Sequence, residues 1–173
     1  VSYFDASMGD AMSARMDLEQ RLRMAIREQS FRAAFQPKVQ LATGTVVGLE
    51  ALSRWQEQDG TIRMPGEFIE LATELGLLDD ITRFTLADVE RHLPALTRQF
   101  GEHISVSVNI AARQASDVAF MQALGQQLAD AGLADRIVLE LTEDALVATQ
   151  RFQRQVLPRL RELGLRVSID DFG

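Results

Sequence analysis

Four apolar segments of the sequence end in or next to a carboxylate or carboxamide side chain. They are Val46–Glu50, Val106–Asn109, Ile137–Glu140 and Val167–Asp171. Each segment is predicted to be a strand, and the carboxyl ends of parallel strands meet at one rim of a sheet or barrel, where functional sites are assembled. We therefore expect four side chains to converge there: Glu50, Asn109, Glu140 and Asp170.

Carboxylates that converge in this way repel one another unless a positive charge neutralises them. Oxygen ligands from Asp, Glu and Asn suit a hard cation such as Mg²⁺ or Mn²⁺. The adjacent Asp170 and Asp171 could serve two ions, and in two-metal sites the ions activate water for in-line attack on phosphorus. For each acid taken alone, a solvated strand end stays open as an alternative, and the Asp170–Asp171 pair could also cap a following helix.

Composition restricts the chemistry further. The 173 residues are 46% hydrophobic and 25% charged, which is typical of one soluble globular domain. The absence of cysteine excludes disulfides and thiolate zinc sites, and two histidines, His92 and His103, leave little for an imidazole cluster. The net charge of −7 argues against binding of DNA or RNA polymers, so an anionic ligand would need local cations or a bound metal.

The sequence contains no apolar run near the roughly 18 residues of a membrane span and no secretory signal pattern. We therefore expect a cytoplasmic domain, and a membrane anchor elsewhere in a longer parent protein stays open.

Residues 1–30 are predicted to form a helix, because apolar residues recur at three- and four-residue steps among charged ones. Its apolar stripe, which includes Met8, Met12, Met16 and Leu22, requires a partner. Two interpretations remain: the helix packs on its own domain or links it to an upstream one, or it forms a coiled-coil dimer contact.

From Phe31 the pattern becomes extended. Two strands around the turn residues 42–45 predict an antiparallel hairpin, and helices are expected at about 65–76 and 79–98. Strands at 104–110, 137–141 and 166–169 then alternate with helices at about 116–131 and 145–163. This alternation predicts right-handed crossovers and a parallel sheet, in either a doubly wound fold or a (β/α) barrel.

The motifs resemble those of the EAL family of cyclic di-GMP phosphodiesterases. The stretch 35–39 (FQPKV) and the stretch 48–55 (GLEALSRW) are similar to the opening of that domain. Further similar motifs follow in order at 65–69 (PGEFI), 107–110 (SVNI), 140–143 (ELTE) and 170–173 (DDFG). The resemblance implies the N-terminal portion, about five strands, of an α/β fold, a (β/α)8 TIM-like barrel with an antiparallel first strand. It divides the chain into a linker helix, residues 1–30, and an EAL-type domain, residues 31–173.

The resemblance also implies an activity and the residues that perform it. The activity is hydrolysis of cyclic di-GMP to the linear dinucleotide pGpG with two Mg²⁺ or Mn²⁺ ions. Glu50, Asn109, Glu140 and Asp170 would bind the first metal, Asp170 and Asp171 the second, and Glu143 would hold the loop that controls the site and dimer coupling. Arg54 would contact a substrate phosphate and Gln36 would line the nucleotide pocket. The implied partners are a second copy in a homodimer and an upstream diguanylate cyclase-type or sensory domain.

Family motifs that follow Asp-Asp-Phe-Gly, including a lysine in a Lys-Ile-Asp motif, are absent from these 173 residues. A complete barrel takes roughly 250 residues. We therefore expect the chain to be part of a longer polypeptide and its activity alone to be doubtful. The alternatives are a receptor that binds cyclic di-GMP without cleaving it and an unrelated phosphate-handling barrel.

Overall fold

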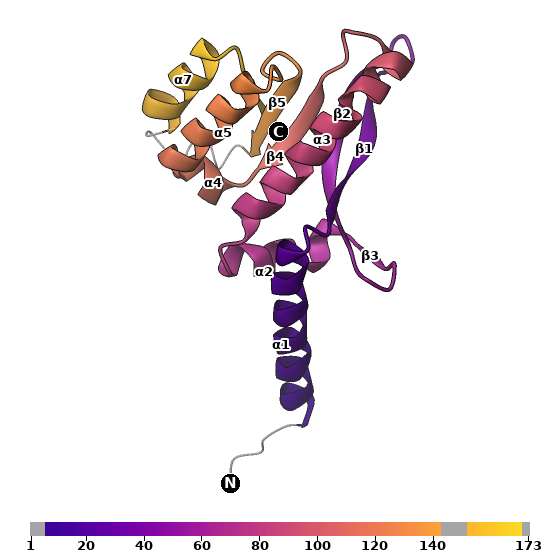
Figure 1. Ribbon diagram of the computed structural model, residues 1–173, viewed down its shortest axis with the longest axis vertical. Coiled ribbons are helices and arrows are strands. Elements are labelled where there is room, and N and C mark those ends of the chain that lie inside the picture. The colour runs from indigo at the N-terminus through magenta and orange to yellow at the C-terminus, as the bar shows by residue number, and fades with distance from the viewer. Residues whose placement is uncertain (1–5, 143–151, 171–173) are drawn as a thin grey trace.

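The centre of the computed structural model, which describes residues 6–142 and 152–170, is one mixed sheet (Figure 1). Strands β2, β4, β5 and β6 run parallel in that order, and β1 pairs antiparallel with β2 at the edge. A short β3 also pairs with β2. The strands are β1 (Phe31–Gln40), β2 (Thr45–Gln56), β3 (Ile62–Arg63), β4 (Val106–Ile110), β5 (Ile137–Thr142) and β6 (Arg166–Asp170). The predicted hairpin and parallel order are confirmed.

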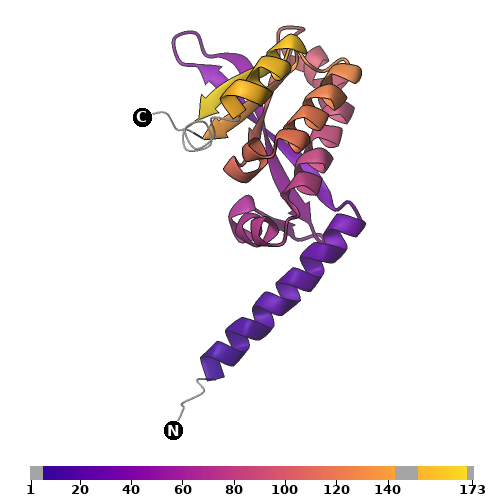
Figure 2. The same cartoon turned by 90° about the vertical axis from the view of Figure 1, so that its left-hand side faces the viewer.

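Helices cover one face of this sheet (Figures 1 and 2). The larger core contains strand residues such as Leu49, Val108 and Leu139 together with helix residues such as Val89 and Leu124. The helical elements are α1 (Ala6–Arg27), the 3-10 turn η1 (Pro65–Glu67), α2 (Ile69–Glu74), α3 (Leu78–Phe100), α4 (Ala112–Ser116), α5 (Val118–Asp130), the π-helical turn η2 (Phe152–Val156) and α7 (Leu157–Glu162). Because side chains alternate along a strand, the neighbours of these core residues point to the opposite face.

The N-terminal helix α1 projects away from the sheet (Figure 2). Its C-terminal turns bury Leu22 and Ala25 in a second core that contains the aromatic residues Phe31, Trp55 and Phe68. Farther toward the N-terminus, Met12 and Met16 are exposed. The packing interpretation therefore holds for the end of α1 near the sheet, whereas the apolar stripe beyond it faces solvent in the described residues.

One predicted helix, at about 65–76, is interrupted, and the helix predicted at about 116–131 is preceded by α4, which was not predicted. Phe68 separates η1 from α2 because its ring is buried in the aromatic core and its backbone, at φ −138°, leaves the helical region. Asp117 separates α4 from α5, since its extended backbone lets the carboxylate accept a hydrogen bond of 3.0 Å from the amide of Phe120 as an N-cap. Of the helix predicted at 145–163, the described part is η2 and α7.

In the described part of the chain, no helix has the length and apolar character that crossing a membrane requires.

Candidate functional site

Glu50 and Asn109 meet on the sheet face that α3 and α5 leave uncovered. Glu50 lies between Leu49 and Ala51, which are buried on the helix-covered face, so its side chain points the other way. The carboxamide Nδ2 of Asn109, on β4, donates a hydrogen bond of 2.7 Å to Oε1 of Glu50 on β2. Two of the predicted ligands are therefore in direct contact.

Glu140 lies beside Asn109, with which it is paired in the β4–β5 register. Its side chain is buried, and its Oε1 accepts from the ammonium Nζ of Lys38, which also donates to Oγ of Ser107 at 3.1 Å. The second carboxylate oxygen, Oε2, is buried and has no hydrogen-bond partner among the described residues. A buried carboxylate oxygen without a partner is costly, so this atom is suited to receive a ligand.

Of the remaining acidic candidates, the structure describes only the backbone of Asp170. Asp170 ends β6, where its backbone is paired with Thr142 at the end of β5. The strand ends of β5 and β6 thus adjoin, as the sequence predicts. Glu143 and Asp171 lie outside the described residues.

Gln36 and Arg54 belong to the same hairpin as Glu50. Gln36 is directly opposite Glu50 in the β1–β2 register, and Arg54 lies four residues farther along β2. Directly paired residues and residues an even number of positions apart on one strand point to the same face of a sheet. Gln36 and Arg54 therefore share the face of Glu50. Arg54 is half-buried and donates to the carbonyl of Ser53 at 2.9 Å through Nη1, which leaves other guanidinium donors for a ligand.

A cavity of about 310 Å³ borders this group. Asn109 and Glu140 form part of its wall, and Leu52, Pro65 and Ile69 supply apolar surface. The combination of a mainly apolar wall with a few polar groups is typical of a small-molecule pocket. The volume lies at the small end of the range for such pockets, roughly 300–1,000 Å³.

The donor set fits a hard divalent cation in chemistry, since it consists of carboxylate and carboxamide oxygens. The unpaired Oε2 of Glu140 supports this fit. Among the side chains that the structure describes, which do not include that of Asp170, no three from Asp, Glu, His or Cys are grouped closely enough to hold an ion. The structure therefore brings Glu50, Asn109 and Glu140 to neighbouring positions, and the predicted four-residue set stays a prediction.

Lys38 is the residue of this site that the sequence interpretation missed. A signal was present: Lys38 lies in the FQPKV stretch, two residues after Gln36, and therefore on the same face of its strand. It is also the only lysine in the sequence, where the other 17 basic residues are arginine.

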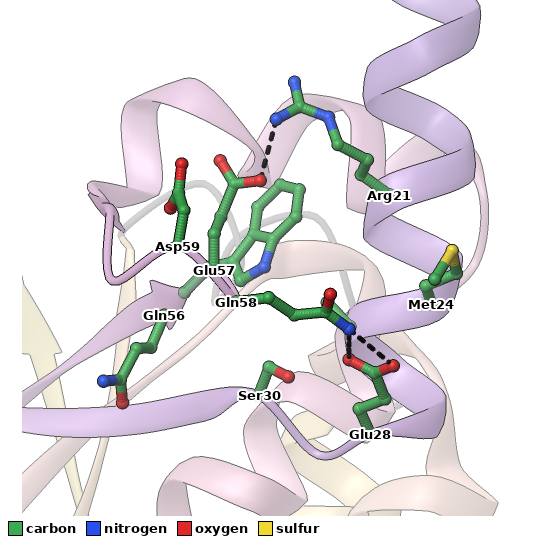
Figure 3. A pocket seen from close by; sticks show the side chains of 10 residues that line it. Arg21, Met24, Glu28, Ser30, Gln56, Glu57, Gln58 and Asp59 are labelled. Atoms are coloured by element: carbon green, nitrogen blue, oxygen red, sulfur yellow. Dashed lines mark hydrogen bonds and ion pairs between the residues drawn. The ribbon is translucent and has the colours of Figure 1, made fainter.

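A separate cavity of about 260 Å³ lies between α1 and the β2–β3 hairpin (Figure 3). Two contacts bridge the helix to the hairpin: Arg21 Nη1 to Glu57 Oε2 at 2.7 Å, and Gln58 Nε2 to both carboxylate oxygens of Glu28 at 3.0 Å. In the hairpin turn, the backbone amide of Thr61 donates to Asp59 and lowers the pKa of that carboxyl below its usual value. None of the predicted site residues lines this cavity, which therefore belongs to the helix junction.

Curated relatives match nearly the whole chain. The chain is 34% identical over 174 residues to the cyclic di-GMP phosphodiesterase NbdA of Pseudomonas aeruginosa, covering all of this chain and 22% of that protein. It is 33% identical over 172 residues to the signaling protein YkoW of Bacillus subtilis, covering 99% of this chain and 21% of that protein. The chain thus spans about a fifth of the length of these two relatives.

Solved structures share the fold. A complex of the phosphodiesterase PaMucR with c-di-GMP superimposes with a TM-score of 0.80 at 28% identity, covering 91% of this chain and 64% of that one. The EAL domain of FimX from Pseudomonas aeruginosa, bound to c-di-GMP, gives a TM-score of 0.75 at 25% identity over 91% of this chain and 63% of that one. The predicted N-terminal portion of a barrel is consistent with these folds. A model of the EAL domain matches residues 19–173, and the chain therefore belongs to the EAL domain family.

Proposed function

We propose that the protein hydrolyses cyclic di-GMP to the linear dinucleotide pGpG with the help of Mg²⁺ or Mn²⁺. The observation that carries this proposal is the group formed by Glu50, Asn109 and Glu140 beside the 310 Å³ cavity, with Oε2 of Glu140 unpaired. A relative named as a cyclic di-GMP phosphodiesterase and a similar structure with c-di-GMP bound support the choice of ligand.

Each residue of the group has a proposed task. Glu50, Asn109, Glu140 and Asp170 would hold one cation, and Asp170 with Asp171 would hold a second. When bound, the cations would supply an activated water and neutralise charge on the phosphate. Asn109 would also orient Glu50 through the 2.7 Å hydrogen bond, which fixes one oxygen of that carboxylate.

The substrate contacts are proposed from position and charge. Arg54 would bind a phosphate oxygen, because its guanidinium keeps its charge and offers several donors in a plane. Gln36 would line the nucleotide pocket, and the apolar cavity wall would contact a base. Glu143 would hold the loop beside the site.

We also propose a domain organisation and partners for the N-terminal helix. Residues 1–30 would act as a linker and residues 31–173 as the EAL-type domain. The exposed Met12 and Met16 of α1 would then contact a second copy in a homodimer or an upstream cyclase-type or sensory domain. We propose that the protein acts in the cytoplasm, where it would bind cyclic di-GMP as a signal.

A second candidate is a receptor that binds cyclic di-GMP without cleaving it. The pocket and Arg54 would serve a receptor equally well, whereas an unpaired buried carboxylate oxygen is costly without a cation to bind. This oxygen favours the enzyme.

The deciding experiment incubates the full-length protein with cyclic di-GMP and either Mg²⁺ or Mn²⁺, and follows the linear product by chromatography. We expect metal-dependent formation of pGpG that chelation abolishes. Tight binding of the dinucleotide without product under either metal would favour the receptor. If the protein neither binds nor cleaves cyclic di-GMP, both candidates fail.

A further inference from the structure

The ammonium group of Lys38 lies beside the acidic residues of the candidate site. It contacts Oε1 of Glu140 on β5 and Oγ of Ser107 on β4, although Lys38 itself lies on β1 at the far edge of the sheet. The residue opposite Lys38 on β2 is Gly48, which presents no side chain on that face. A long side chain can therefore extend from the edge strand toward the centre of the sheet.

The position of Lys38 relative to the rim explains which carboxylate oxygen stays free. Lys38 is paired with Gly48, two residues before Glu50 on β2, so its ammonium approaches from the amino-terminal side of the parallel strands. It binds Oε1 of Glu140 and leaves Oε2 without a partner. One oxygen of the same buried carboxylate is thus neutralised by the protein, and the other is available.

Glu140 is 6% exposed, so an ionised carboxylate there needs a counter-charge. Lys38 supplies the only cationic contact that this side chain makes in the described residues. We propose that Lys38 is a positioning residue that acts as an internal counter-ion: it stands in for part of the metal charge and keeps the site assembled before a divalent cation binds. This inference rests on the proposed metal site.

The proposal predicts opposite effects on the metal-free and the metal-bound protein. Without Lys38, Glu140 would be buried without a counter-charge, so the metal-free domain would be less stable. A divalent cation would then meet one positive charge fewer and bind more tightly. The neutral Lys38→Met variant retains most of the side-chain volume and isolates the charge.

The test uses full-length protein and its Lys38→Met variant, with Mn²⁺ as the probe. We expect the unfolding transition of this domain to fall by about 5 °C in chelator and the difference to shrink in millimolar Mn²⁺. Calorimetric titration should give a Kd for Mn²⁺ about three- to tenfold lower in the variant. An unchanged transition and Kd, or weaker Mn²⁺ binding, would overturn the proposal.

Two further variants keep the test decisive if Lys38→Met alone unfolds. In Lys38→Met/Glu140→Gln, the charge that needs neutralising is also removed, so stability in chelator should recover toward that of the Glu140→Gln single variant. Additive losses would contradict the counter-ion role. The matched control is Arg32→Met, which removes a cation from the same face of β1 where the guanidinium binds backbone carbonyls of residues 29 and 31; its Kd for Mn²⁺ should equal that of the parent.

The outcome separates this inference from the proposed function. If the parent protein cleaves cyclic di-GMP and Lys38→Met leaves metal affinity unchanged, the proposed function stands and the counter-ion role fails. If the parent binds neither Mn²⁺ nor cyclic di-GMP, the proposed function fails, whereas the stability coupling between Lys38 and Glu140 in chelator is still measurable.

Discussion

Asn109 donates its carboxamide hydrogen to Glu50 over 2.7 Å, although 59 positions of sequence separate the two residues. The contact joins β4, near its carboxyl end, to the middle of β2, which continues to Gln56. It satisfies one oxygen of Glu50 and leaves the Asn109 carbonyl oxygen directed elsewhere, because the amide nitrogen and the carbonyl oxygen of a carboxamide lie in one plane and point away from the shared carbon in different directions. Asn109 is also paired with Glu140 in the β4–β5 register, so this neutral side chain lies between the carboxylates of Glu50 and Glu140.

Replacing Asn109 with leucine should therefore weaken metal binding. The variant removes a ligand oxygen and leaves Glu50 without its orienting donor, and loss of such support typically costs tenfold to a hundredfold in metal affinity. Calorimetric titration of the full-length protein with Mn²⁺ measures the change. Gln122→Leu removes an exposed carboxamide from α5 and is the matched control. Equal Kd values for Asn109→Leu and the control would exclude Asn109 from the metal site.

Arg54 should matter for the dinucleotide and not for the cation. We expect Arg54→Ala to weaken cyclic di-GMP binding, because charge-assisted hydrogen bonds to phosphate are lost, and to leave the Kd for Mn²⁺ nearly unchanged. Both constants can be measured by calorimetry, with dinucleotide titrated in the presence of Ca²⁺ to limit turnover. Arg23→Ala on α1, where the guanidinium pairs with Glu19, is a control for the lost charge. Parallel loss of both ligands would make Arg54 structural.

The strand order and the strand-end positions of Asn109, Glu140 and Asp170 could be predicted because each depends on local pattern. The prediction was wrong for Glu50, because β2 continues beyond it to Gln56. Alternation of apolar strands with helices gives the parallel order, and a polar residue that ends an apolar run identifies the rim. The contact of Lys38 with Glu140 could not be predicted in this way, since it joins residues 102 positions apart on strands that are not neighbours and depends on the missing side chain at Gly48. The break at Phe68 likewise results from tertiary packing of its ring, which overrides the helical spacing around it.

Asp88 should stabilise the edge strand that carries Gln36 and Lys38. Its buried carboxylate accepts 2.9 Å from the backbone amide of Ala33 on β1 and 2.7 Å from Arg91. Asp88→Leu leaves that amide without its partner, which should cost about 1–3 kcal/mol in the free energy of unfolding.

Urea denaturation of this domain measures the loss. Asp88→Asn keeps an acceptor oxygen and should lose less, and Glu90→Leu, at an exposed position of α3, should be nearly neutral. If Asp88→Leu and Glu90→Leu unfold at the same urea concentration, the Ala33 contact does not hold β1.

Two glycines in helices should respond oppositely to alanine. A Cβ at Gly125 on α5 would lie 2.5 Å from Cδ2 of Leu160, which is fully buried on α7. Gly125→Ala should therefore destabilise the domain by about 1–3 kcal/mol through overpacking. Gly9 of α1 has open space around it, so Gly9→Ala should be neutral or slightly stabilising. Thermal unfolding of both variants checks the contrast, and a Gly125→Ala variant as stable as its parent would show that α5 and α7 can separate without cost.

Substitution of Glu50 should affect cleavage of cyclic di-GMP more than its binding. Glu50→Ala removes a carboxylate from the proposed metal set and leaves Asn109 without its acceptor, so hydrolysis should fall below detection under Mg²⁺ or Mn²⁺. Binding should suffer less, because Arg54, Gln36 and the apolar cavity wall remain. The experiment compares pGpG formation with dinucleotide affinity in Ca²⁺, which keeps oxygen coordination with looser geometry.

The matched control is Glu57→Ala. It removes a carboxylate directly after β2, where Glu57 contacts Arg21 of α1, and leaves the candidate site unchanged. We expect the control to cleave cyclic di-GMP at the parent rate once its folding has been verified by circular dichroism. If the Glu50→Ala variant still cleaves at the parent rate, Glu50 has no role in the reaction. Loss of binding and cleavage by the same factor would mean that Glu50 shapes the pocket, and the metal set would then have to be built from the carboxylates of β5 and β6.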